Sequence, residues 1–278
     1  LGVLTAVTGV AGSGKSTLVA EVTRRLGDDD GHEVIVMDQA PLHTSRRSTP
    51  ATYLGFHDRI RHLLARANGV SASLFSANSR GACPRCRGLG TIDTDLAFLE
   101  TVTTVCEACG GRQFNDEALR YRLHGRTIRE LLDLTVTAAL DVFTDEAILG
   151  PLHRLDAVGL GHLTIGQQLS TLSGGERQRL ALASVLDRAG GIYVLDEPTA
   201  GLHPADVGRL LDVLHGLVDA GGTVIVVEHD LQVVADADWV IDLGPGAGRD
   251  GGRVLFAGPP AELVDHPRSL TARHLRRV

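Results

Sequence analysis

Long apolar runs are missing from this 278-residue chain. No stretch approaches the roughly 20 residues that a membrane-spanning helix needs, and no charged segment near the N-terminus leads into an apolar signal core. The sequence also has no long internal repeat and no low-complexity tract. These absences favour a globular protein without a membrane partner, and we expect a cytoplasmic location.

Cysteine and methionine are both scarce. The four cysteines form two tight pairs, both between residues 83 and 109, which in an intracellular chain is more typical of metal binding than of disulfides. The only methionine is Met37, and the chain begins at Leu1, which is typical of a piece of a longer protein or of an unusual start. We therefore leave open whether an N-terminal half exists.

What the chain does contain is typical of a globular α/β protein. Hydrophobic residues make up 43% of it and charged residues 22%, and it has 33 glycines, so we expect one principal domain with an insert. The formal charge is −7, yet residues 40–90 hold a single acid, Asp58, against eight arginines: Arg46, Arg47, Arg59, Arg61, Arg66, Arg80, Arg85 and Arg87. Such arginines often only solvate loops, but this stretch leads into the cysteines, which favours phosphate contact.

Hydrophobic patterning predicts a parallel sheet. Apolar runs at 192–195 and 223–227 flank a helical segment at 204–218, which indicates a β-α-β unit whose strands are covered on both faces. Strands are also predicted at 4–8 and 33–37, and edge strands at 239–243 and 253–257.

Helices and loops are predicted from spacing and capping signals. A helix is predicted around 18–22, a loop over 41–52 and a helix over 59–67. Thr127 and Ser173 each stand three residues before a glutamate, which is the spacing of a capping box and predicts that two helices start there.

A phosphate-binding loop is predicted at residues 9–16, between the first strand and the first helix. The segment Gly-Val-Ala-Gly-Ser-Gly-Lys-Ser lets backbone amides surround a β-phosphate, while Lys15 reaches the β and γ oxygens and Ser16 ligates magnesium. The alternative is a chance glycine-rich turn. The predicted nucleotide contacts in this segment are Gly9, Gly12, Ser13, Gly14, Lys15, Ser16 and Thr17.

Two adjacent carboxylates end the apolar run at 192–195. Ligands bind at the carboxyl ends of parallel strands, so Asp196 is predicted to serve magnesium and the nucleotide, with Glu197 as the general base for the attacking water. Taken alone, such a pair is more often a solvated strand end. Gln39 and His229 follow two other predicted strands, which adds them to the catalytic set with Lys15 and Glu197.

The four cysteines have the spacing of two zinc knuckles. Cys83 and Cys86 form one pair and Cys106 and Cys109 the other, and together they can close a tetrahedral four-thiolate site. Because that shell leaves no open position, we predict a structural zinc ion. The alternative, a redox pair, does not explain why two matched pairs occur.

Taken together, these motifs resemble the second cassette of the UvrA family of ABC ATPases over essentially the whole chain. The resemblance is carried by the phosphate-binding loop, by the signature Leu-Ser-Gly-Gly-Glu at 172–176, by Asp-Glu-Pro-Thr-Ala-Gly-Leu-His at 196–203, by Glu228-His229 and by the cysteine insert. It implies an α/β fold: a P-loop ABC-type ATPase with a parallel-rich central sheet and an inserted helical, zinc-binding signature subdomain. The implied core is 1–56 with 187–278, and the implied insert is 57–186, with the zinc module at about 81–112 and the signature helix at 173–188.

The resemblance also implies roles and partners. Ser173, Gly174 and Gly175 would contact nucleotide held by a second cassette, supplied by another copy or by an N-terminal half, and His229 would sense the γ-phosphate. ATP turnover, with magnesium, would be coupled to recognition of damaged double-stranded DNA in nucleotide excision repair, with transfer to a UvrB-like subunit. DNA would lie along the basic region, and the candidate contacts are Arg47, Arg80, Arg85 and Arg87.

Some positions depart from the family pattern. His43 and Thr49 stand where the family usually has glycine and asparagine, and residues 68–80 are shorter than in typical repair members. These departures lie in the region expected to face DNA, so a UvrA-like paralogue for resistance to DNA-binding drugs is an alternative. A transporter ATPase subunit and a nucleic-acid-binding module with an inactive ATPase are two further alternatives.

Overall fold

The computed structural model describes residues 2–28, 33–37, 45–94, 102–186, 190–248 and 251–276. Gln39 and His43 lie outside these ranges. The chain forms two compact units, the first comprising residues 1–41, 157–159 and 173–278, and the second residues 42–156 and 160–172. In the part of the chain described here, no helix is long and apolar enough to cross a membrane.

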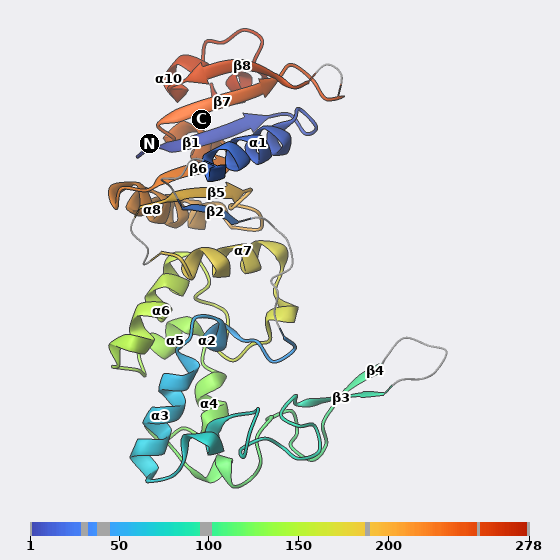
Figure 1. The fold of residues 1–278 in the computed structure, drawn as a ribbon, viewed down its shortest axis with the longest axis vertical. Coiled ribbons are helices and arrows are strands. Elements are labelled where there is room, and N and C mark those ends of the chain that lie inside the picture. Colours follow the sequence, from blue (N-terminus) through green and yellow to red (C-terminus); the bar gives the residue numbers. More distant parts are fainter. Residues whose placement is uncertain are drawn as a thin grey trace. The chain divides into compact units, whose positions relative to one another are not determined.

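The first unit is an α/β layer structure around a six-stranded sheet (Figure 1). Its strands are β1 (Leu4–Gly9), β2 (Val34–Met37), β5 (Ile192–Asp196), β6 (Thr223–Val227), β7 (Trp239–Gly244) and β8 (Arg253–Gly258). Its helices are α1 (Lys15–Asp28), α7 (Gly174–Ala183), α8 (Pro204–Asp219), α9 (Leu231–Asp236), α10 (Pro260–Leu263) and α11 (Leu270–Leu275).

The sheet is parallel except at one edge. The strand order is β2-β5-β6-β1-β7-β8, and only β8 runs antiparallel to its neighbour. The predicted parallel-rich α/β fold is therefore confirmed. One expectation was wrong: β7 is not an edge strand, because it lies between β1 and β8 and pairs along its length with β1.

This topology places the loops that hold the candidate site residues close together. The β1-α1-β2 connection and the β5-α8-β6 connection run in opposite directions along the sheet, so right-handed crossovers place α1 and α8 on opposite faces. The carboxyl ends of β1, β5 and β6 then meet at one edge of the sheet, where parallel α/β proteins bind ligands. Residues far apart in the sequence are brought together there.

The second unit is mainly helical. Its elements are α2 (Pro50–Tyr53), α3 (His57–Asn68), α4 (Ile128–Leu132), α5 (Val136–Leu140), α6 (Glu146–Ala157), β3 (Thr91–Thr94) and β4 (Val102–Val105). Its interior includes Phe56, Ile60, Phe75 and Ile148, each at most 1% exposed. Phe75 also meets the ring of Tyr121 edge-on, with ring centroids 6.0 Å apart.

The second unit differs from the sequence prediction in two places. Residues 41–52 were expected to be loop throughout, but α2 begins at Pro50 because the Thr49 side chain accepts a hydrogen bond from the Thr52 amide and so caps it. The antiparallel hairpin β3-β4 was not predicted. It extends away from the helices of this unit (Figure 1).

Both predicted capping boxes are present. The Thr127 hydroxyl accepts a hydrogen bond from the Glu130 amide at the start of α4, and Ser173 and Glu176 do the same at the start of α7. The division into core 1–56 with 187–278 and insert 57–186 stays a prediction about functional parts. The compact units themselves divide after Pro41 and assign α7 to the first unit.

Candidate nucleotide and metal sites

A cavity of about 550 Å³ opens at the carboxyl edge of the first unit's sheet. It is lined by Ala11, Gly12, Gly14, Lys15, Ser16, Thr17, Asp196, Glu197, Val227 and His229. These residues come from the loop after β1 with the first turn of α1, and from the ends of β5 and β6 with the residues that follow them. Three segments that were predicted to act on one nucleotide therefore share one pocket.

The phosphate-binding loop is shaped by its backbone. At Gly9, φ is +133° and a Cβ would lie 2.2 Å from the Leu243 carbonyl oxygen, so only glycine fits there. Ser13 is fully buried within the loop, and the Lys15 ammonium donates hydrogen bonds to the carbonyls of Gly9 and Val10 at 2.9 and 3.1 Å. Gly9 and Ser13 thus shape the loop, while Gly12, Gly14, Lys15, Ser16 and Thr17 line the cavity.

Lys15 is the buried cation of this cavity. Burial lowers the pKa of its ammonium below the ordinary value, and the carboxylates of Glu197, Asp196 and Asp242 oppose that shift. The side chain is only 7% exposed and is surrounded by loop carbonyls. A negatively charged phosphate would replace those carbonyls as its partner and favour the charged form.

Glu197 and His229 form a pair inside the cavity. The His229 Nε2 atom lies 3.3 Å from Glu197 Oε1, which joins the predicted general base to the predicted γ-phosphate sensor. Glu197 has a φ of +50°, in the left-handed region that a non-glycine residue adopts at a cost of order 1–3 kcal/mol. Its amide donates to the Val227 carbonyl at 2.9 Å, so a bond to β6 holds this backbone conformation.

Ser16 and Asp196 are placed for a magnesium ion. Both line the cavity, with Ser16 in the first turn of α1 and Asp196 at the end of β5. A hydroxyl and a carboxylate are oxygen donors of the kind that magnesium prefers when it also binds nucleotide phosphates. The residues therefore fit the ion.

The signature residues lie in the first unit but outside the lining of this cavity. The Ser173 amide donates to the Glu176 carboxylate at 2.7 Å, and a Cβ on Gly175 would lie 2.4 Å from the Ala200 carbonyl oxygen. Gly174 begins α7. The first turn of α7 is thus packed tightly against the turn that follows β5, and Ser173, Gly174 and Gly175 are not among the residues that line this cavity.

The four cysteines meet in the second unit. Cys83, Cys86, Cys106 and Cys109 are all buried, and their sulfur atoms lie within 4.8 Å of one another. The Sγ atoms of Cys86 and Cys109 are 3.7 Å apart, far beyond disulfide length and close to the ~3.8 Å edge of a zinc tetrahedron with ~2.3 Å bonds. The cluster fits a zinc ion with four thiolate ligands.

Backbone amides donate hydrogen bonds to some of these sulfur atoms, which favours the thiolate form that binds a metal. The Gly90 amide donates to Cys86 Sγ at 3.2 Å. Burial raises the pKa of the Cys106 thiol, but hydrogen bonds from the Cys109 and Ala108 backbone outweigh it and lower that pKa to about 7. At Cys109 burial prevails and raises the pKa to about 12. A cation is needed to hold all four groups as thiolates together.

The basic segment is partly neutralised. Arg46 pairs with Asp93 of β3, Arg59 with Asp145, and Arg80 with Glu117 at 2.6 Å. Within the described ranges, Arg47, Arg66, Arg85 and Arg87 have no carboxylate partner. The Arg47 guanidinium donates to the Arg87 carbonyl at 2.8 Å, which ties it to the first cysteine knuckle.

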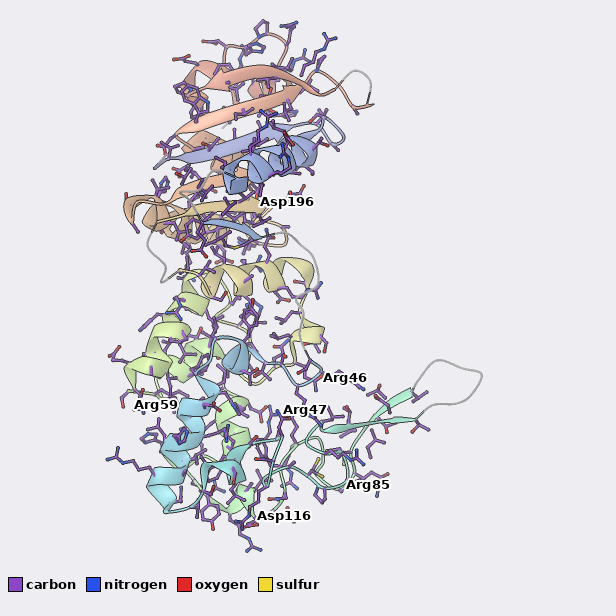
Figure 2. The ribbon with its side chains drawn as sticks, viewed as in Figure 1. Arg46, Arg47, Arg59, Arg85, Asp116 and Asp196 are labelled. Carbon is purple, nitrogen blue, oxygen red and sulfur yellow. The ribbon has the colours of Figure 1, made fainter. Side chains whose placement is uncertain are left out.

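These arginines do not share one surface. Figure 2 shows Arg46 and Arg47 on the segment before α2 and Arg85 on the cysteine module, whereas Arg59 lies on the far side of the helices. All four predicted DNA contacts are exposed. Arg47, Arg85 and Arg87 belong to the region formed by the segment before α2 and the cysteine module, whereas Arg80 is ion-paired with Glu117.

Sequence reasoning missed two features of the nucleotide site. Glu228 is 2% exposed and accepts hydrogen bonds from the turn after β5 and from the residues after β6, although its place next to His229 was the only sign of it in the sequence. A second glycine-rich segment also supports the phosphate-binding loop, because the Gly248 and Gly252 amides donate to the carbonyls of Gly12 and Ser13. The cluster of glycines at 244–252 was the available signal for that contact.

Comparison with known proteins gives consistent matches. Residues 1–200 match the family model described as ABC transporter. The whole chain is 44% identical to UvrABC system protein A of Streptomyces avermitilis and 43% identical to that of Bacillus subtilis. Among solved structures, UvrA2 from Deinococcus radiodurans matches the whole chain with a TM-score of 0.91 and 46% identity.

The chain spans only part of these relatives. It covers 30% of the Streptomyces protein, 32% of the Bacillus protein and 37% of the Deinococcus chain. The Streptomyces alignment runs over 307 positions against 278 residues here, so that relative carries segments that this chain lacks.

Proposed function

We propose that this chain, which belongs to the ABC family of ATP-binding cassettes and is UvrA-like in sequence and fold, binds and hydrolyses ATP and couples turnover to damaged-DNA recognition in nucleotide excision repair. The UvrA-like ABC ATPase predicted from the motifs is confirmed as the family. The observation that carries the proposal is the shared cavity of the phosphate-binding loop, Asp196, Glu197 and His229.

In this proposal each wall of the cavity has one task. The loop amides and Lys15 bind the phosphates, and Ser16 and Asp196 would hold a magnesium ion, which would supply neutralisation of phosphate charge. Glu197 accepts the proton of the attacking water, and His229, 3.3 Å from that carboxylate, orients it and contacts the γ-phosphate. Gln39, which follows β2 in the sequence and lies outside the described residues, stays a predicted member of the set.

The site needs a second cassette. Ser173, Gly174 and Gly175 do not line the chain's own cavity, so we assign them to nucleotide held by another copy or by an N-terminal half. Turnover per chain should then rise with protein concentration when the second cassette is another copy. Turnover independent of concentration, in a chain shown to be monomeric, would contradict this assignment.

In this proposal the second unit binds DNA. We propose that zinc bound by Cys83, Cys86, Cys106 and Cys109 fixes the knuckles, and that Arg47, Arg80, Arg85 and Arg87 contact DNA phosphates, with Arg80 released from Glu117. Such contacts read shape and deformability rather than base sequence. A UvrB-like subunit would then receive the lesion.

The deciding experiment is ATP turnover by the zinc-loaded protein with no DNA, with intact duplex and with duplex bearing a bulky adduct, at two salt concentrations. Stimulation that weakens with salt and is larger for the adduct supports repair. Turnover without any DNA effect would instead favour a cassette driven by another partner, and absence of turnover would overturn the ATPase assignment.

The arginine assignment is tested separately. Arg47→Ala should weaken DNA binding and reduce the slope of log affinity against log salt by about 1. Arg59→Ala is the matched control, because it removes the same charge from the far side of the helices (Figure 2). Equal effects of the two substitutions would mean that only net charge matters.

A further inference from the structure

Glu228 is a buried carboxylate whose oxygens are fully used. It lies directly after β6, is 2% exposed and accepts four hydrogen bonds. Oε1 accepts from the Thr199 amide at 2.9 Å and from the Thr199 hydroxyl at 2.6 Å. Oε2 accepts from the amides of His229 and Asp230 at 2.8 and 3.2 Å.

These four donors belong to two segments that carry catalytic groups. Thr199 lies in the turn after β5, two residues beyond Glu197, and the Ala200 amide closes that turn on the Glu197 carbonyl at 3.0 Å. The other two donors are the backbone of His229 and its neighbour. The Glu228 side chain therefore connects the backbone segment that carries the general base to the backbone segment that carries the histidine.

We propose that Glu228 is a positioning residue that holds Glu197 and His229 at their working separation. This inference rests on the proposed ATPase function. Strand pairing fixes Asp196 opposite Val227, but β5 and β6 both end there, so the ladder does not extend to the catalytic pair. Beyond the ladder, the Glu197 amide bond to Val227 and the Glu228 carboxylate connect the two segments.

The chemistry of the site calls for a carboxylate. All four partners act as donors, and an ionised glutamate is an acceptor on both oxygens, whereas a glutamine would turn its NH₂ group toward two of them. Glu197 also has a left-handed backbone, which persists only where surrounding contacts hold it. Loss of the carboxylate should therefore let the base move while the phosphate-binding loop stays in place.

The test is Glu228→Gln in the full chain, with Glu262→Gln, an exposed residue of helix α10, as matched control. We expect kcat to fall about 10²-fold, the loss that a displacement near 1 Å causes, with the Kd for ATP unchanged. Glu262→Gln should match the wild type. If Glu228→Gln keeps the wild-type kcat, or if kcat and ATP affinity fall together with Tm, the positioning role is overturned.

A double-mutant cycle separates positioning from general destabilisation. In a Glu197→Gln background, Glu228→Gln should cause no further loss of turnover, because the group it positions is already disabled. Additive losses would contradict the inference. If Glu228→Gln does not fold, Thr199→Val removes one of the four donors and should lower kcat less, again without changing ATP affinity.

The failure of this inference is distinguishable from failure of the proposed function. If the wild-type chain turns over no ATP even when a second cassette is present, the proposed function is refuted before any variant is made. A wild-type chain that turns over ATP, with a Glu228→Gln variant that is equally active, refutes only the positioning role.

Discussion

The nucleotide cavity and the cysteine cluster are built in opposite ways. The cavity takes its walls from the ends of β1, β5 and β6, which lie far apart in the sequence and meet only through sheet pairing. The four cysteines lie within residues 83–109 and meet through two short knuckles. A long-range site depends on topology, and a local site depends on spacing, so the two should respond differently to perturbation.

Removing the proposed zinc ion should produce the largest difference between the two units. Structural zinc contributes on the order of 10 kcal/mol to small zinc-bound modules, so chelation or Cys106→Ser should abolish hydrogen-exchange protection across residues 81–112. ATP affinity of the first unit should not change. Hydrogen-exchange mass spectrometry with parallel ATP titration measures both, and restored protection after zinc is added back is the control.

Loss of ATP binding on zinc removal would contradict the independence of the two sites. That outcome would mean that the local metal site stabilises the long-range site as well, and that the two are not independent.

Glu197→Gln should have the next largest effect, and it should affect the nucleotide cavity rather than the cysteine cluster. Removing a general base typically costs 10²–10⁴-fold in rate, so steady-state turnover should fall by about 10³-fold while ATP still binds. Zinc content and protection of residues 81–112 should match the wild type. Glu262→Gln is the control, and wild-type turnover in Glu197→Gln would reassign the base.

The two capping boxes offer a smaller and closely matched test. Thr127→Ala and Ser173→Ala each remove a cap worth about 1 kcal/mol, so both should lower the free energy of unfolding by similar amounts in denaturant titrations. Only Ser173→Ala should also lower turnover, because we assign Ser173 to a partner's nucleotide. Equal loss of turnover in both variants would remove that distinction.

The last prediction concerns pH. Burial, with help from the Arg61 charge, lowers the pKa of His57 to about 4 from its usual value near 6.5. The unfolded chain then binds the proton more readily than the folded one, so stability should be lost as pH falls from about 6.5 toward 4 and be retained above. His57→Gln should flatten this part of the profile of Tm against pH, whereas an unchanged slope would contradict the assignment.

Local signals in the sequence predicted much of the molecule. The capping residues at 127 and 173, the strands at 192–195 and 223–227 and the four cysteines all depend on neighbours a few residues away, and all are where the spacing placed them. The hairpin β3-β4 was missed because its short strands, TIDT and VTTV, carry little hydrophobic alternation.

The sequence by itself determined which residues are candidates for phosphate binding, catalysis and metal binding, because a phosphate-binding loop and paired cysteines are defined by contiguous residues. Only the tertiary structure decided that β7 is internal, that glycines at 248 and 252 support the phosphate-binding loop, and that Glu228 joins two catalytic segments. Strand order and contacts between segments arise from packing of the whole sheet, and no local pattern of residues records them.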